Sequence, residues 1–254
     1  MQFQTSYTWS KAMDVGQSQL GSAEDPPPPD PMNLRLEKGP MRSDTPHNLR
    51  FNAIYRLPEF TQKGGAVATL MNGWWISGIL SLQTGYPFNP LVSANRSRSK
   101  ATIGTQASNS DRPDLAPGRH NSNIVSGTTA GCAGVTAGRK LGTPDLYYDP
   151  CAFTLQQAGF LGTAGRNILR GPGLANLDFS IVKDSAVKFL GEGGKVEFRT
   201  EFFNVLNRPN FASKPATSVF AGNRDDDPRL ATAGLISNTA TTARQIQFAL
   251  KVLF

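Results

Sequence analysis

The side chains able to do chemistry in this sequence are few and widely separated. His47 and His120 are its two histidines, and the sequence suggests no Ser or Cys that either could activate as a nucleophile. Glu197 and Glu201 flank Arg199 at alternate positions and could be mistaken for the paired carboxylates of a hydrolase. Along one face of one strand, however, such charges are more typical of a structural ladder. We therefore predict a protein that is not an enzyme, with no catalytic residues, metal or cofactor.

The two cysteines, Cys132 and Cys151, lie in one loop-like region and are close enough in sequence to pair. In an oxidising compartment such as the periplasm or the cell surface, a disulfide between them would staple that loop. Two free thiols without a role are the alternative interpretation. The separation fits no metal-binding pattern, and the histidines are the only further soft ligands.

The formal charge of +7 invites a nucleic-acid interpretation. Lys and Arg are scattered among Asp and Glu, however, and do not form a basic run. We predict no nucleic-acid partner, and we assign the basic balance to loop and interior residues.

The fold class predicted from the composition is all-β, because Gly, Pro, Asn, Ser and Thr are plentiful and helical periodicity is missing. Alternation of apolar and polar residues marks six segments: 2–10, 47–57, 73–84, 174–183, 195–206 and 245–254. Most are about ten to twelve residues long, whereas strands of soluble sheets are usually about five or six and membrane-spanning strands about nine to eleven. The lengths favour strands that cross a membrane.

The connections between these segments alternate in length. Three are long (12–46, 85–173 and 207–243) and two are short (58–72 and 184–194). Outer-membrane barrels have long loops outside the cell and short turns in the periplasm. We therefore predict an antiparallel transmembrane β-barrel segment of about six long strands, with long extracellular loops and short periplasmic turns.

The six blocks together resemble the end of the barrel of TonB-dependent receptors, in the Oar-like version with a carboxypeptidase-regulatory-like domain. The blocks are SYTWSKAMD at 6–14, SDTPHNLRFNAIYRLP at 43–58, GWWISGILSLQTGYPFNP at 73–90, GTAGRNILRGPGLANLDFSIVKD at 162–184, FRTEFFNVLNRPNF at 198–211 and RQIQFALKVLF at 244–254.

This resemblance implies a barrel of 22 strands around a plug. Residues 1–254 would supply the C-terminal part of the barrel, and the plug and N-terminal strands have no counterpart. No secretory signal follows Met1, as expected of a trimmed or partial chain. The resemblance implies a bacterial outer-membrane location, lipid contact, a ligand of unknown identity at the outer loops, and energy-coupled passage. The TonB complex would act only through the missing N-terminal part.

Three sets of residues acquire roles in such a barrel. The last strand resembles the signal read by the barrel-assembly machinery, with Phe248, Leu250, Val252 and Phe254 as its apolar and aromatic members. An aromatic girdle at the lipid interface would contain Trp9, Trp74, Trp75, Tyr86 and Phe88. A charge ladder in the lumen would contain Arg50, Asp178, Glu197, Arg199, Glu201 and Lys251.

Two alternatives remain open from the sequence. One is a complete small outer-membrane barrel or surface adhesin whose long loops hide further strands, with room for a hairpin within 101–170. The other is a soluble, secreted, carbohydrate-binding β-sandwich, which would need a core filled by the apolar strand faces.

Overall fold

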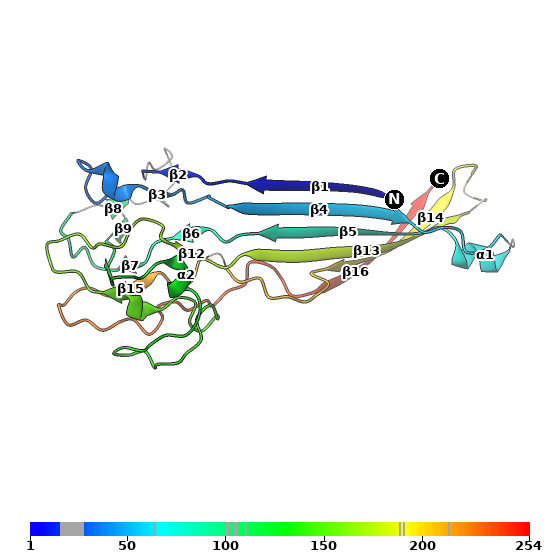
Figure 1. Ribbon diagram of the computed structural model, residues 1–254. Coiled ribbons are helices and arrows are strands. Elements are labelled where there is room, and N and C mark those ends of the chain that lie inside the picture. The colour runs from blue at the N-terminus through cyan, green and yellow to red at the C-terminus, as the bar shows by residue number, and fades with distance from the viewer. Residues whose placement is uncertain are drawn as a thin grey trace.

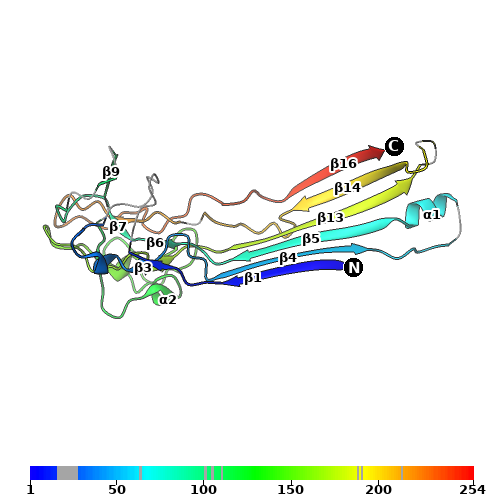
Figure 2. The same ribbon diagram turned by 90° about the horizontal axis from the view of Figure 1, so that it is seen from above.

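The computed structural model describes residues 1–15, 28–62, 65–99, 102–103, 106–109, 111–187, 189, 191–212 and 214–254. Its main element is one sheet of six antiparallel strands in the order of the chain (Figures 1 and 2). The strands are β1 (Gln2–Trp9), β4 (His47–Arg56), β5 (Trp74–Gln83), β13 (Leu174–Ala186), β14 (Lys195–Phe203) and β16 (Gln245–Leu253). All six predicted strands are thereby confirmed, each within three residues of its predicted ends.

The register brings like residues together across the sheet. Phe51 lies opposite both Thr5 and Leu80, and Leu80 lies opposite Leu177. One face of the sheet is therefore mostly apolar and the other mostly polar, because successive side chains alternate between the faces. Trp74 shares the apolar face with Ile76, which settles the orientation of the most uniformly apolar strand.

No sandwich forms around this sheet. Its apolar face is solvent-accessible, with Phe248 67% and Leu250 69% exposed, and no second sheet covers it among the described residues. The sandwich alternative is therefore wrong, since that fold requires these side chains to form a core. β1 and β16 are the edges, each paired on one side only, and the sheet is not closed.

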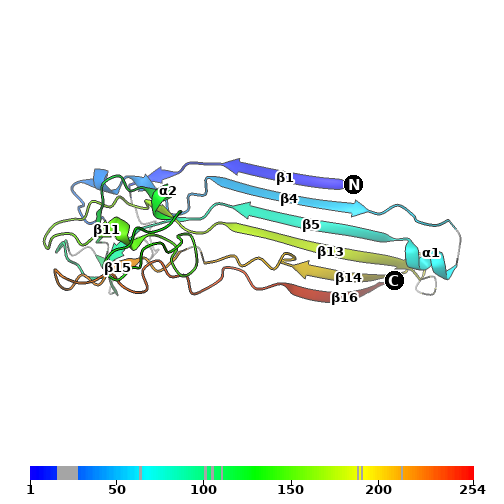
Figure 3. The same cartoon turned by 60° about the horizontal axis from the view of Figure 1, so that its bottom comes forward.

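The two short connections leave one end of the sheet (Figure 3). In the connection between β13 and β14, Val187 N–H donates to Gly194 O at 2.9 Å and so brings the ends of the two strands together. Residues 57–73 contain a short helix, α1 (Ala66–Met71), that the alternation analysis did not predict.

The three long connections gather at the other end and carry small elements. The helical ones are η1 (Leu34–Glu37), α2 (Asn121–Ile124) and η2 (Pro150–Ala152). The strands form five two-stranded ladders: β2 (Met13–Asp14) with β3 (Gly39–Pro40), β6 (Pro87–Phe88) with β12 (Leu169–Arg170), β7 (Leu91–Val92) with β15 (Ser218–Phe220), β8 (Thr102–Ile103) with β9 (Gln106–Asn109), and β10 (Asp114–Leu115) with β11 (Phe153–Thr154). The hairpin for which 101–170 has room is the β8–β9 pair. None of these strands is long enough to cross a membrane.

Candidate ligand-binding surface

The hydrophobic core of the molecule lies among the long connections and not against the sheet. Tyr148, Phe153 and Phe88 pack together, with ring centroids 5.8 Å apart for Phe88 and Tyr148 and 6.2 Å for Tyr148 and Phe153. Val92 and Val219 are fully buried beside them. These residues come from the second and third connections, so the two segments fold as one unit. We call the packed assembly of residues 10–15, 28–46, 84–173 and 204–244 the outer-loop cluster, within the described residues.

Buried ion pairs attach the first connection to the second. Arg112 donates from both terminal nitrogens to Glu37, at 3.0 Å and 2.6 Å, and from Nε to Ala164 O at 2.8 Å. Glu37 is 4% and Arg112 8% exposed. This planar two-bond arrangement is the strongest type of ion-pair hydrogen bonding, and burial protects it from solvent screening.

Further arginines also join the connections, each through an ion pair with a carboxylate. Arg166 pairs with Asp14 and Arg170 with Asp44, again joining the second connection to the first. Arg96 pairs with Asp225, which joins the second connection to the third. Each pair holds together segments that are far apart in the sequence.

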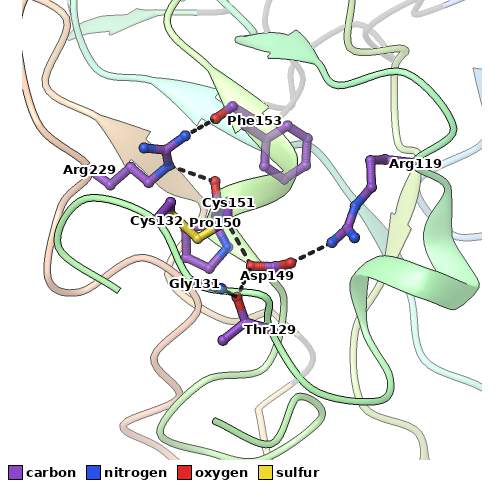
Figure 4. The surroundings of a disulfide bond; sticks show 9 residues. All are labelled: Arg119, Thr129, Gly131, Cys132, Asp149, Pro150, Cys151, Phe153 and Arg229. Atoms are coloured by element: carbon purple, nitrogen blue, oxygen red, sulfur yellow. Dashed lines mark hydrogen bonds and ion pairs between the residues drawn. A yellow bond between two sulfur atoms is a disulfide. The ribbon is translucent and has the colours of Figure 1, made fainter. Parts of the chain in front are cut away.

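A disulfide joins Cys132 and Cys151, whose Cα atoms are 5.7 Å apart. Figure 4 shows it beside the buried carboxylate of Asp149, which pairs with Arg119 and accepts hydrogen bonds from Thr129 Oγ1 at 2.8 Å and Cys151 N–H at 3.0 Å. The disulfide interpretation of the sequence agrees with this geometry. The bond fixes a glycine-rich segment, which has little regular structure of its own, to the core.

Arg229 closes the same region from the third connection. Its guanidinium donates to Pro150 O at 2.9 Å and Phe153 O at 2.6 Å (Figure 4). It also lies 5.3 Å from the ring centre of Phe220. Burial lowers the pKa of Arg229, while the negative charge of Asp149 partly offsets this effect. The two carbonyl oxygens and the Phe220 ring replace water as partners of the charged Arg229 guanidinium and so stabilise it.

Two tyrosines of the core remain neutral. Burial raises the pKa of Tyr147 to about 12, and it raises the pKa of Tyr148 still further above the usual range. Tyr148 Oη donates to Ala216 O at 3.0 Å and so provides another link between the second and third connections. The raised pKa values make both hydroxyls unsuitable as bases at neutral pH.

Removing the disulfide is expected to loosen the outer-loop cluster without disturbing the sheet. In the chain-entropy description, a bond closing a loop of this length stabilises by about 3 kcal/mol. We expect Cys132→Ser combined with Cys151→Ser to increase protease cleavage within 128–150 while the strands stay protected. Mass mapping of the fragments measures this, and unchanged cleavage would show that Asp149 and Arg229 suffice to hold the segment.

The hollows at this end of the molecule include two of similar volume. One, of about 300 Å³, is lined by Pro29 and Leu36 from the first connection and by Arg112 and 161–165 from the second. The other, of about 310 Å³, opens on the polar face of the sheet and is lined by Asn176, Asp178, Phe203, Asn204, Thr241, Thr242 and Gln245. Their volumes are at the lower limit for small-molecule sites. The second offers amide, hydroxyl and carboxylate groups for hydrogen bonding.

The polar face carries a shorter charge ladder than predicted. Arg199 contacts Glu197 at 2.9 Å and Glu201 at 3.5 Å, and Lys251 lies opposite Glu197 in the register. The two remaining predicted members, Arg50 and Asp178, make other contacts. Arg50 donates to Gln83 Oε1 at 3.2 Å, and Asp178 accepts hydrogen bonds from the Asn176 side chain and from Asn204 N–H. β5 and β13 separate β4 from β14, so Arg50 cannot reach the acidic residues.

The sequence model of one protein family, described as an outer membrane beta barrel domain, matches residues 1–247. The chain belongs to this outer-membrane β-barrel family. Its location is therefore the bacterial outer membrane. Comparisons with curated proteins and with solved structures gave no match. No helix in the described part of the chain is long and apolar enough to cross a membrane.

Membership of the family assigns the faces of the sheet. In an outer-membrane barrel the apolar face meets lipid, the polar face lines the lumen, the long loops are extracellular and the short turns are periplasmic. The outer-loop cluster thus lies on the cell surface. The ladder of Glu197, Arg199 and Glu201 lies on the lumen wall, where water and neighbouring charges can satisfy it.

The aromatic girdle can include only part of the predicted set. Trp9, 66% exposed, and Tyr86 lie toward the extracellular end of the sheet, and Trp74 begins β5 at the periplasmic end. Trp75 is a correction, because alternation turns it to the lumen face, where its ring centre lies 5.7 Å from the Arg199 guanidinium. Phe88 is another, because it is 2% exposed within the loop core. For the other three residues the interfacial role stays a prediction.

The remaining predicted residues have clear places. Phe248, Leu250, Val252 and Phe254 are exposed on and just beyond β16, and their role in assembly stays a prediction. His47 Nδ1 lies 2.8 Å from Tyr7 Oη across β1 and β4. His120 precedes α2, where its backbone N–H donates to Asn123 Oδ1 at 2.9 Å and its Nδ1 lies 3.0 Å from Ser122 Oγ. The described residues contain no group of three or more His, Cys, Asp or Glu side chains that could hold a metal ion.

Sequence reasoning missed the residues that organise the extracellular surface: Glu37, Arg112, Asp149, Arg166, Arg170 and Arg229. Arginines recur along the second connection, and acidic residues lie in the other two. Nothing in their spacing shows which arginine meets which carboxylate.

Proposed function

We propose that this chain forms part of the barrel of a TonB-dependent receptor of the Oar-like type. Its outer-loop cluster would bind a ligand at the cell surface, and the lumen wall would line the path of that ligand into the periplasm. The six ordered sequence blocks that resemble these receptors support the proposal. In such receptors the plug closes the lumen, and the TonB complex supplies the energy that moves it.

The observation that carries the proposal is the open sheet beneath a folded extracellular unit. Backbone groups along the free edges of β1 and β16 have no water to bond within a bilayer, so each edge requires a further strand as partner. A sheet completed by many strands makes a wide barrel with a polar interior, which needs a plug to prevent leakage. A large receptor barrel would supply these further strands.

The buried ion pairs support ligand binding by the outer-loop cluster. A surface held rigid before binding loses less conformational entropy when the ligand arrives. Loops joined by Arg112, Arg170 and Arg229 meet this condition. Under this proposal the chain binds and conducts but catalyses no reaction. Its partners are outer-membrane lipid, the barrel-assembly machinery and a ligand of unknown identity, with no role for nucleic acid.

A surface adhesin or a complete smaller barrel is the second candidate. The packed core of the outer-loop cluster favours it, since an adhesive domain also needs a stable extracellular surface. The two candidates differ in energy dependence. Adhesion requires only binding, whereas a TonB-dependent receptor accumulates its ligand only when TonB is functional.

The deciding experiment compares cells with the gene product, without it, and with it in a TonB-deficient background. Depletion of compounds from a complex medium is followed by mass spectrometry. The receptor proposal expects at least one compound to be depleted only in the first strain, with surface binding retained in the third. Equal depletion by all three strains, with gene-dependent attachment to surfaces, would replace the receptor by an adhesin.

The orientation in the membrane gives a separate prediction. Ser126 lies exposed in the second long connection, and Glu192 lies exposed in the turn between β13 and β14. We expect a membrane-impermeant maleimide to label Ser126→Cys on intact cells, and Glu192→Cys only after the outer membrane is permeabilised. The two variants serve as controls for each other. The opposite labelling pattern would show that the long connections face the periplasm and the short ones the cell exterior.

A further inference from the structure

The helix α1, in the periplasmic turn between β4 and β5, presents an uncovered apolar stripe. Val67 and Leu70 are 64% and 67% exposed, and Met71 is also exposed. Their spacing of three and four residues places them along one side of the helix. The helix has only six residues and cannot be stable through its own hydrogen bonds. Contact of this stripe with a further apolar surface would stabilise the helix.

The stripe is connected directly to the lipid-facing side of the sheet. Trp74, the first residue of β5, lies on that side, and its Nε1–H donates to Leu70 O at 2.9 Å. Lys183 lies opposite Trp74 in the register, with Nζ 5.9 Å from the centre of the indole ring. The Lys183 side chain is only 8% exposed and its Nζ donates to Asp184 O at 2.8 Å, so it supports the indole ring from within the protein. A tryptophan at the end of the lipid-facing surface matches the level of phospholipid headgroups.

The orientation of α1 is fixed by a second set of contacts. Asn72, which ends the helix, accepts a hydrogen bond from Phe60 N–H at 2.8 Å and donates one to Thr61 O at 2.7 Å. This clamp ties the helix to the extended segment that leaves β4. No charged residue occurs between Gly65 and Asn72, so insertion beside headgroups leaves no side-chain ion to desolvate.

We propose that α1 is an interfacial anchor that lies in the periplasmic leaflet of the outer membrane. Val67, Leu70 and Met71 insert among the upper acyl carbons, while the Trp74 side chain lies at the headgroups. The apolar surface of the barrel thus continues past the end of β5 into the turn. The occupant of the stripe is phospholipid, the same solvent that covers the adjoining strands. This inference rests on membership of the outer-membrane barrel family and does not depend on transport.

The test uses spin labels at Val67→Cys and Leu70→Cys, with Thr69→Cys on the other side of the helix as the matched control. The complete gene product is reconstituted in phospholipid vesicles without reductant, which preserves the disulfide. Collision rates are measured with oxygen, which concentrates in lipid, and with a water-soluble nickel chelate. All three side chains are exposed, so labelling leaves the packing intact, and mobility on unheated gels confirms folding.

We expect the oxygen-to-chelate collision ratio at positions 67 and 70 to exceed that at position 69 several-fold. The difference should vanish when the protein is unfolded. Equal and high chelate access at all three positions would overturn the proposal, because the stripe would then lie in water. Low access to both reagents at 67 and 70 would also overturn it, because a protein partner and not lipid would cover the helix.

Discussion

Phe248→Arg is expected to destabilise the folded barrel by about 2–4 kcal/mol, the cost of a cation at mid-membrane depth on the lipid face. Phe248 lies near the middle of β16, is 67% exposed and stacks on Phe198 of β14 with ring centroids 6.2 Å apart. The arginine would lose this contact and leave its charge in hydrocarbon. Urea unfolding of the complete gene product in vesicles, followed by the mobility of unheated samples on gels, measures the loss.

Gln247→Arg is the matched control for this prediction. Gln247 is the neighbouring residue and faces the lumen, opposite Glu201 in the register. The same arginine should therefore cost little there, since water and a carboxylate are available to it. Equal effects at 247 and 248 would contradict the assignment of the two faces. A smaller loss of stability at 248 than at 247 would show that the lipid-facing and lumen-facing sides are the other way round.

Arg112→Met is expected to destabilise the outer-loop cluster by about 3–5 kcal/mol, because it leaves the Glu37 carboxylate buried without its cation. The loss should be local, since the ion pair joins extracellular segments and does not contact the sheet. Hydrogen exchange should accelerate in 28–46 and 84–173, with the strands unchanged. Cleavage of the surface loops by added protease on intact cells provides a second measurement.

The double variant Arg112→Met with Glu37→Leu tests whether the loss comes from the unpaired charge. Removing both ions restores an uncharged interior, and such replacements are often neutral or stabilising. We expect the double variant to recover most of the protection lost by Arg112→Met. If it stays as labile as the single variant, the hydrogen bond from Arg112 to Ala164 O is the more important contact.

The ion pairs also bear on how a ligand would be recognised at the cell surface. Most of the buried arginines already bond to carboxylates or carbonyls, so they organise the outer-loop cluster and leave ligand contact to others. The polar hollow beside Asp178 and Asn204 lies between the lumen wall and the third long connection. A ligand held there would contact both the wall and the loops, which is where passage into the lumen begins.

The sheet could be predicted from the sequence because its stabilisation is local and periodic. In β14, Val196, Phe198 and Phe202 alternate with Glu197, Arg199 and Glu201, and this alternation determines both the strand and its two faces. Where the pattern weakened, the prediction was poorer. The predicted fifth strand continued to 206, but Asn204 adopts a left-handed conformation with φ of 50°, which ends the strand. Its Oδ1 accepts a hydrogen bond from Arg208 N–H at 3.0 Å and so closes a turn.

The girdle errors have the same physical origin. Trp74 and Trp75 are adjacent, so alternation must send one to lipid and the other to the lumen. Phe88 lies only five residues beyond β5, but the chain there has already entered the outer-loop cluster. Nearness to a strand end does not show whether an aromatic residue faces lipid or a protein core.

By itself, the sequence determined the six strands, their antiparallel order, the two faces of the sheet and the alternation of long and short connections. These features depend on residues within about two positions of each other, and on chain length. Only the tertiary structure decided that the long connections form one cored unit, that Arg112 meets Glu37 and Arg170 meets Asp44, and that α1 presents an apolar stripe. Such contacts join residues far apart in the chain, and no local periodicity encodes which arginine finds which carboxylate.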